Sequence, residues 1–359
     1  MRTDELPPGS PSARGRSRAT TLVVTLFLFA AACGSSPSTG AIGAGLRGPS
    51  GLHAEVYARG MKQAASFAFD PQGRLWVATA AANDSGADAV YVVTKAGATA
   101  KKVIAGVHTP LGLLWHGDTL FVSSAGRVDT YSGFDGTAFA STTRIVSLPD
   151  GVGEVNGMVF GPDGRVHLGI SSPCDHCTPA SPYSAALVSF LPDGHDLRVD
   201  ATGIRAPIDF AYYPGTSDLF VTMNQRDDLG AKTPGDWLAV VADGQRWGFP
   251  ACYGQGGAAC VGVPKAVATL DPHAAVSGIA IATGQLGSRV GTAAIVAEWA
   301  KGKVLRVGLH RHGAGYTGTV STLLTGISNP VAVALGPDRA LYVGDWSSGV
   351  VYRVARAAS

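Results

Sequence analysis

The sequence predicts an all-β protein folded as a six-bladed β-propeller, and three observations support this prediction. Glycine and proline occur 48 and 21 times in 359 residues, and both disfavour the interior of a helix. A strand–turn–strand pattern recurs six times along the chain. Further apolar strands follow each copy, which gives four strands per repeat of about 40–50 residues, the size of a propeller blade.

The repeated unit starts with an apolar strand, a turn carrying Pro, Asp or Gly, and a second apolar strand. The six copies occupy residues 67–79, 112–124, 158–170, 210–223, 278–299 and 333–346. Third strands are expected at 89–94, 127–131, 186–191, 237–241, 303–308 and 350–355. A more polar fourth strand follows, as at 101–106 and 321–326.

One strand lies outside this order. Residues 53–58 (HAEVYA) resemble a fourth strand but precede the first blade. We expect them to pair with 350–355, so that the first and last blades join and no free edge remains. The propeller is therefore expected to span residues 52–356.

The N-terminal residues 1–33 have the features of a secretory signal. Arginines precede an uncharged run, 21–32, that is shorter than the roughly 20 residues a membrane-spanning helix needs. The run ends in FAAACG, which resembles a bacterial lipoprotein box in which Cys33 receives the lipid. Residues 34–51 are rich in Gly, Ser and Pro and are expected to form a flexible tether. We expect an extracytoplasmic protein, lipid-anchored to the cell envelope, with an ordinary cleaved signal as the alternative.

Four further cysteines occur as two pairs, each inside a long loop. Cys174 and Cys177 enclose Asp-His, and Cys252 and Cys260 lie eight positions apart. The first spacing and His176 are compatible with a metal, but a zinc site would need a second pair at similar spacing. An even number of cysteines in an oxidising compartment favours two local disulfides, although four cysteines allow three connectivities.

The charge balance excludes one class of partner. The formal net charge is +2 and only 15% of residues are charged, without a basic block. Nucleic-acid binding by phosphate neutralisation is therefore not expected.

Polar residues gather where the channel of the propeller should open. The residues just before the innermost strands should converge on one face, and these are Gln63, His108, Glu154 with Asn156, Arg205, His273 and Asn329. The ends of the second strands should add Asn83, Asp84, Ser171, residues 224–228, Trp299 with Lys301, and Asp345 with Trp346. Arg and Lys suit an anionic or polyoxygenated ligand, and Trp offers a stacking surface. We expect a ligand site here, the alternative being a solvated channel lined by structural residues.

Several stretches between residues 154 and 355 carry a resemblance to a known family. They are VFGPDGRVHLGISSPCDHC, WGFPACYGQ with Cys260, PHAAVSGIAI and NPVAVALGPDRALYVGDWSSGVVYRV. With both cysteine pairs in this order, the chain resembles the glucose/sorbosone dehydrogenase family, closest to its sorbosone dehydrogenase-like branch. The resemblance implies a periplasmic or secreted quinoprotein that holds pyrroloquinoline quinone (PQQ) with calcium over the channel. Such an enzyme oxidises a sugar or alcohol and needs an electron acceptor.

The resemblance also implies roles for single residues. Arg205 stands at a cofactor-contacting position, although the Asn that usually follows is Ala206. Gln225 and Arg226 fall in the loop whose backbone carbonyls serve calcium, and Lys301 lies near a basic position of the fifth blade.

The catalytic base is the main departure from the family pattern. The usual His before VFGPDG is replaced by Gly153-Glu154. Glu154 is the first candidate base, because a partly desolvated carboxylate near a cofactor can accept a proton at neutral pH. His273 aligns with a His of the sorbosone branch and is the second candidate.

Two other function classes fit the same sequence. Six-bladed lactonases hold a divalent cation in the channel, and Glu154, Asn156 and Asn224 or Asp345 are candidates for such ligands. A non-catalytic propeller that binds a saccharide or a protein is the third reading, because a fold does not determine a function.

Overall fold

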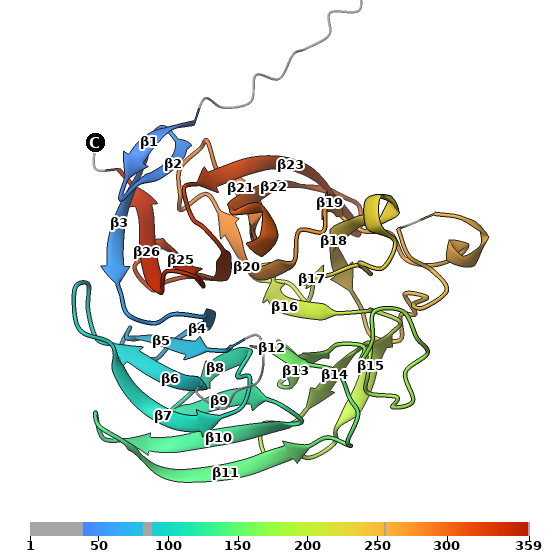
Figure 1. Cartoon of the computed structure of the whole chain (residues 1–359), viewed down its shortest axis with the longest axis horizontal. Helices are drawn as coiled ribbons and strands as arrows, with labels where there is room; N and C mark the ends of the chain where they lie inside the picture. The colour runs from blue at the N-terminus through green and yellow to red at the C-terminus, as the bar shows by residue number, and fades with distance from the viewer. Residues whose placement is uncertain (1–38, 82–87, 255, 358–359) are drawn as a thin grey trace, which may run out of the picture. The chain divides into compact units, whose positions relative to one another are not determined.

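The computed structural model describes residues 39–81, 88–254 and 256–357. Its strands form six antiparallel sheets arranged around a central axis, which confirms the predicted six-bladed propeller (Figure 1). The predicted signal segment with Cys33, and the predicted mouth residues Asn83 and Asp84, lie outside the described residues.

The strands follow the predicted repeats blade by blade. The first blade consists of β4 (Ala64–Phe69), β5 (Leu75–Thr79), β6 (Asp88–Val93) and β7 (Lys101–Val107), and the second of β8 (Gly112–His116), β9 (Thr119–Ser124), β10 (Arg127–Phe134) and β11 (Phe139–Ser147). The third contains β12 (Val155–Phe160), β13 (Val166–Ile170), β14 (Ala186–Phe190) and β15 (Arg198–Thr202), and the fourth β16 (Pro207–Tyr212), β17 (Leu219–Met223), β18 (Gly235–Val241) and β19 (Ala268–Pro272). The fifth contains β20 (Val276–Thr283), β21 (Thr292–Glu298), β22 (Lys303–His312) and β23 (Gly315–Thr325), and the sixth β24 (Pro330–Leu335), β25 (Leu341–Asp345), β26 (Val350–Arg356) and β3 (Leu52–Ala58).

The second strands are among the most buried parts of their sheets. Every residue of β5, β13, β17 and β25 is buried. These strands are predominantly apolar because neighbouring sheets cover both of their faces, so no polar face is needed. The first strands β4, β8, β12, β16, β20 and β24 pack against one another in sequence and line the axis.

Small residues allow the innermost strands to approach closely at the axis. A Cβ added to Gly278 in β20 would come within 2.5 Å of the Val331 carbonyl oxygen in the next blade. At Gly157 in β12, a Cβ would come within 2.9 Å of the Ile208 carbonyl oxygen. Both glycines lie at the β-bulge near the start of the strand, and the same place in β16 is occupied by Asp209. A carboxyl group therefore lies where two other blades need glycine.

The ring closes as the sequence predicts. Strand β3 pairs antiparallel with β26, with Ala58 opposite Val351 and Ala54 opposite Val354. An ion pair of 2.9 Å between Glu55 and Arg353 crosses this junction. The sixth blade therefore takes its outer strand from the N-terminal side of the chain, and the closure leaves no open edge between the first and last blades.

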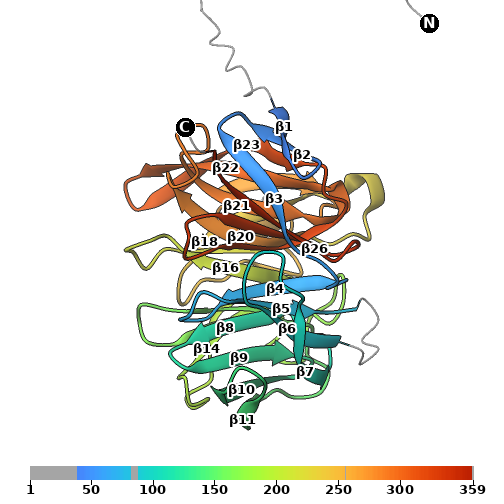
Figure 2. The same ribbon diagram turned by 90° about the vertical axis from the view of Figure 1, so that its left-hand side faces the viewer.

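The expectation of a flexible tether over residues 34–51 is wrong for its described part. Residues 39–49 form a hairpin, β1 (Thr39–Gly43) and β2 (Leu46–Pro49), that extends the fifth blade through the pairing of Arg47 with Thr325 (Figure 2). Leu46 and Ile42 are buried in the core cluster of blades five and six. The apolar side chains that alternate among the glycines bury enough surface to order this segment.

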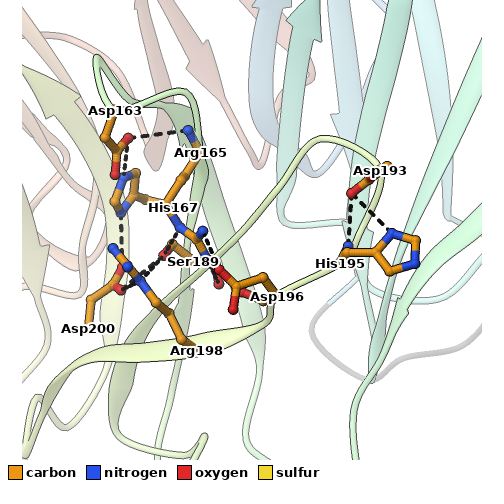
Figure 3. A network of polar contacts seen from close by, with 9 residues as sticks. All are labelled: Asp163, Arg165, His167, Ser189, Asp193, His195, Asp196, Arg198 and Asp200. Atoms are coloured by element: carbon orange, nitrogen blue, oxygen red, sulfur yellow. Dashed lines mark hydrogen bonds and ion pairs between the residues drawn. The ribbon is translucent and has the colours of Figure 1, made fainter.

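A buried polar network ties together the outer strands of the third blade (Figure 3). His167 in β13 lies between two carboxylates, with Nδ1 3.1 Å from Asp200 and Nε2 3.2 Å from Asp163. Burial alone lowers the pKa of His167, but its hydrogen bonds to Asp200 and Asp163 outweigh this and raise it above the ordinary value. The buried Arg165 donates to the Ser189 hydroxyl at 2.8 Å, and Ser189 donates to Asp200 at 2.9 Å. These groups satisfy one another, so the network is structural.

Helices contribute little to the described chain. Those that occur there are 3₁₀ turns of three residues, such as η3 (Trp299–Lys301). None within the described ranges is long and apolar enough to cross a membrane.

Candidate functional site

The segments predicted to meet at one end of the channel do meet there. In every blade, a backbone carbonyl just before the innermost strand accepts a hydrogen bond from the residue that ends or follows the second strand. The acceptor–donor pairs are Gln63–Ala80, His108–Ala125, Glu154–Ser171, Ala206–Asn224, Ala275–Trp299 and Asn329–Trp346. In the fourth and fifth blades the carbonyls that accept this hydrogen bond are those of Ala206 and Ala275. Arg205 and His273 therefore do not occupy the position that the sequence predicted for them.

Three cavities border one another at this end. A channel cavity of about 530 Å³ runs along the innermost strands, a mouth cavity of about 630 Å³ lies above it, and a side pocket of about 240 Å³ opens between blades three and four. Glu154 and Ala275 line all three. A ligand at the mouth would therefore face Glu154 from any of these spaces.

Glu154 combines a fixed backbone with an accessible carboxylate, as a catalytic group requires. Its backbone carbonyl is used in the junction with Ser171, while its side chain is exposed to the cavities. Within the described chain no hydrogen bond or ion pair engages its carboxylate. Gly153 before it packs so tightly that an added Cβ would collide with the Ser171 carbonyl. The backbone of Glu154 is thus fixed, and its carboxylate is free to meet a ligand.

Two tryptophans form an aromatic wall at the mouth. The rings of Trp299 and Trp346 meet edge to face at a centroid distance of 6.0 Å, and both line the mouth cavity. Trp346 donates its indole N–H to the Ala80 carbonyl at 3.0 Å, and the Asn329 amide donates to the Trp299 carbonyl at 3.0 Å. Trp299 remains 36% exposed, so one part of its ring is available for stacking against a bound ring.

Arg205 lines the side pocket but is not a free cation. Its Nη2 atom lies 2.5 Å from the carboxylate of Asp175, and its Nε donates to the Asp175 carbonyl at 3.0 Å. Its Nη1 donates to the Asn224 carbonyl at 3.2 Å. Arg205 therefore links the third and fourth blades, and only part of its guanidinium faces the pocket.

The loop after β17 offers oxygen atoms suited to a calcium ion. The side-chain oxygen of Asn224 is buried without a hydrogen-bond partner and the residue lines both the channel cavity and the side pocket. Among the described residues, no donor is bonded to the carbonyl oxygens of Gln225 or Arg226. Neighbouring groups hold this segment in place: the Arg226 side chain pairs with Asp228 at 2.6 Å, and the backbone N–H of Gln225 donates to the Asp236 carboxylate at 2.8 Å. Carbonyl and amide oxygens are hard ligands of the kind that calcium prefers, so this loop fits the ion.

His273 does not have the position of a general base, because both of its ring nitrogens are already bonded. It is exposed near the loop after β17, with Nδ1 2.7 Å from the Asp227 carboxylate and Nε2 2.8 Å from the Gly230 carbonyl. The Gly230 carbonyl and the Asp227 carboxylate raise the pKa of His273, because both stabilise the protonated ring. In this arrangement His273 fixes the loop and has no free lone pair directed at the mouth.

The remaining predicted residues have mixed positions. Asn156 lines the channel cavity, but its amide is used to hold Ser171 and the Pro207 carbonyl at 2.8 and 2.9 Å. Gln63, His108, Lys301 and Asn329 are not among the residues that line the three cavities. Lys301 is exposed at the end of η3.

Sequence reasoning missed a set of buried carboxylates around the mouth. Asp236 lines the side pocket and joins the loop after β17 to β20 by accepting from Gln225 and Val276, and burial raises its pKa to about 6. In the first blade, Asp88 likewise accepts hydrogen bonds from two separate segments, through the backbone amides of Ala81 and Thr109. Both aspartates lie at the start of the third strand of their blade, as the first residue of β6 and the second of β18, so an alignment of the repeats was the available signal. Asp209 in the channel wall has no such signal.

Both predicted disulfides are present. Cys174 is bonded to Cys177, and Cys252 to Cys260. The His176 ring contacts Phe249 and Tyr253 edge to face at 6.4 and 6.2 Å, so the two disulfide loops pack together.

Comparisons with known proteins identify the fold. A scan of family models gave no match to this chain, and a search of curated proteins gave none either. Among solved structures, the chain resembles the PQQ domain of a pyranose dehydrogenase from Coprinopsis cinerea in its holo form, with 16% identity and a TM-score of 0.71 over 87% of this chain and 97% of that one. It also resembles the PQQ-bound aldose sugar dehydrogenase from Streptomyces coelicolor, with 18% identity and a TM-score of 0.65 over 86% and 99% of the two chains.

A third similar structure was solved with calcium. It is a family AA12 carbohydrate-active enzyme from Trichoderma reesei, with 13% identity and a TM-score of 0.71 over 90% of this chain and 98% of that one. At these identities the likeness concerns the fold. The chain thus shares the six-bladed propeller architecture of solved PQQ-dependent sugar dehydrogenases.

Proposed function

We propose that this protein is a quinoprotein-type dehydrogenase that oxidises a sugar or an alcohol at the mouth of the channel, using PQQ and calcium. The observation that carries the proposal is the unpartnered carboxylate of Glu154, which borders all three cavities beside an aromatic wall and a loop with free oxygen ligands. The fold shared with PQQ-bound sugar dehydrogenases supports the choice of cofactor.

The residues of this chain would divide the work as follows. The carbonyls of Gln225 and Arg226 and the side-chain oxygen of Asn224 would hold calcium, and Trp299 would stack against a bound ring. Glu154 would accept the proton of the substrate hydroxyl as general base. When bound, the quinone supplies the acceptor for the hydride from the carbon that carries this hydroxyl. A separate electron acceptor is then needed to restore the oxidised quinone.

A divalent-cation-dependent sugar lactonase is less well supported. Across the part of the chain that the structure describes, no three His, Cys, Asp or Glu side chains lie close enough to form a metal site. The side-chain NH2 group of Asn156, a candidate ligand for such a site, is engaged with Ser171 and the Pro207 carbonyl, so only its amide oxygen could bind an ion. The paired disulfides fit an oxidising compartment, and with the predicted signal we propose an extracytoplasmic, lipid-anchored location.

Reconstitution with PQQ and calcium tests the function. We expect uptake of the quinone, seen by its absorbance, and dye reduction with at least one member of an aldose and alcohol panel. A ligand at 100 times its Kd should stabilise the protein by about 2.7 kcal/mol, which raises the melting temperature.

Variants identify the base. Glu154→Gln should lower kcat by about 100-fold or more and leave quinone uptake unchanged, because only the proton acceptor is lost. Asp118→Asn, an exposed carboxylate in the β8–β9 turn at the other end of the blade, is the matched control and should behave as wild type. Absence of quinone uptake and dye reduction in the wild-type protein would refute the proposal.

A further inference from the structure

The loop after β17 is attached to the third blade through a single carboxylate. Asp175 accepts hydrogen bonds from the backbone amides of Asp227, at 3.0 Å to each oxygen, and of Asp228 at 2.7 Å. The same carboxylate forms the ion pair with Arg205. One side chain therefore binds both a cation that lines the side pocket and the segment that follows the carbonyls of Gln225 and Arg226.

Asp175 is itself held in a small covalent ring. It lies between Cys174 and Cys177, whose disulfide closes a loop with only two residues between the cysteines. Its backbone carbonyl accepts from Nε of Arg205, so Arg205 contacts both the main chain and the side chain of the same residue. A four-residue ring has little conformational freedom, so the Asp175 carboxylate is presented in a fixed direction.

The next residue of the ring anchors the second disulfide loop. His176 donates from Nε2 to the Pro250 carbonyl at 3.2 Å and contacts the ring of Tyr253. Tyr253 in turn lies under the guanidinium of Arg226, 4.6 Å from its centre. The loop after β17 is thus contacted by the first disulfide ring directly and by the second through Tyr253.

A third contact holds the same loop from the fifth blade. His273 binds the Asp227 carboxylate and the Gly230 carbonyl. The charged groups around the loop, Asp175, Arg205, Arg226, Asp227, Asp228, His176 and His273, are therefore paired with one another or packed against it. Arg205 itself reaches only the start of the loop, at the Asn224 carbonyl, whereas Asp175 connects Arg205 to the amides of Asp227 and Asp228.

We propose that Asp175 is a positioning residue, which the Cys174–Cys177 ring aims at Arg205 and at the 227–228 backbone to set the geometry of the side pocket. Loss of its charge would free Arg205 from its ion pair and release the amides that keep the Gln225 and Arg226 carbonyls oriented. The claim about position stands on the contacts alone. Its consequence for cofactor affinity rests on the proposed function.

Amide hydrogen exchange tests the positional claim without any cofactor. In Asp175→Asn, exchange at the amides of Asp227 and Asp228 should accelerate about tenfold, because hydrogen bonds to a carboxylate are stronger than those to an amide oxygen. The double variant Cys174→Ser/Cys177→Ser should give the same local acceleration. Asp193→Asn removes an exposed carboxylate whose partner within the described chain is His195, and it should leave both amides unchanged. Wild-type exchange rates at 227 and 228 in both Asp175→Asn and the cysteine variant would overturn the inference.

A double-mutant cycle on quinone affinity tests the consequence. With PQQ and calcium as ligands, Asp175→Asn should raise the Kd about tenfold at an unchanged melting temperature, and the Arg205→Lys/Asp175→Asn pair should bind no more weakly than Arg205→Lys alone. A purely structural role would lower the melting temperature and give additive losses, which would overturn the positioning role. If the wild-type protein takes up no PQQ, the proposed function fails, and the exchange experiment alone decides the position of Asp175.

Discussion

Replacing Asp209 by asparagine, which removes its charge, should make the protein more stable. The carboxyl group of Asp209 lies in the wall of the channel cavity, at the bulge where β12 and β20 have glycine. It accepts one hydrogen bond from the Ile279 amide at 3.1 Å, which joins the fourth blade to the fifth. Burial raises its pKa from 3.8 to about 7. Asp209→Asn keeps the shape and the acceptor oxygen while removing the ionisable group.

The size and the pH window of the effect follow from this shift. A raised pKa means that the folded state binds the proton more tightly than the unfolded chain, so the wild-type protein loses stability as the pH rises from 3.8 to about 7. Each unit corresponds to about 1.36 kcal/mol, so a shift of about three units sets a ceiling of about 4 kcal/mol. Because the carboxyl group borders the channel, where water screens its charge, we expect about 1–3 kcal/mol in favour of Asp209→Asn above pH 7.

Urea unfolding at pH 4, 6 and 8 provides the measurement, since the free energy of unfolding falls linearly with denaturant. The wild-type protein and Asp209→Asn should be similar in stability at pH 4, and the difference should widen until about pH 7. A difference that is the same at pH 4 and pH 8, or a variant that is less stable at pH 8, would refute the reasoning.

Three further predictions concern other parts of the molecule. The raised pKa of His167 means that its stabilising contribution is complete below pH 6.5 and declines as the pH rises through the folded-state pKa. His167→Gln should therefore lower the free energy of unfolding more at pH 6 than at pH 9. An equal loss at both pH values, or an imidazole that titrates below 6.5 by NMR, would contradict this. Leu46→Ala should lower the free energy of unfolding by about 2–5 kcal/mol, because Leu46 is fully buried in the N-terminal hairpin, and an unchanged urea midpoint would argue against that docking. Gly153→Ala should displace Glu154 and lower kcat about 100-fold, and kcat close to that of wild type would show that the Ser171 backbone can yield.

The repeats and their closure could be predicted from sequence because they depend on local patterns. The second strands are predominantly apolar, and the turns at 71–73 and 162–164 carry residues that fix the backbone angles. The pairing of 53–58 with 350–355 followed from an unmatched strand at each end. By contrast, the hairpin at 39–49 was missed because it lies in the Gly-, Ser- and Pro-rich stretch 34–51, while a few buried side chains such as Leu46 decide its order.

The candidate site was predicted in position but only partly in detail. The sequence brought Glu154, Asn156, Arg205 and Trp299 to the cavities, as the structure does. It placed His273 there as well, but the innermost strand of that blade begins later, so Ala275 lines the mouth instead. Contacts between side chains of different loops, such as that of Asp175 with Arg205, depend on how separate insertions fold together. No local sequence pattern predicts such contacts.

The way the ring closes has a consequence for incomplete chains. The seven residues of β26 supply the only partner of β3 within the sixth sheet and one of the two partners of β25. A chain that stops before residue 350 would therefore leave two unpaired strand edges, one at each end of the row of blades. Exposed edges template association with other chains. Premature termination close to the C-terminus should thus produce an aggregating protein, although almost all of its core residues have already been made.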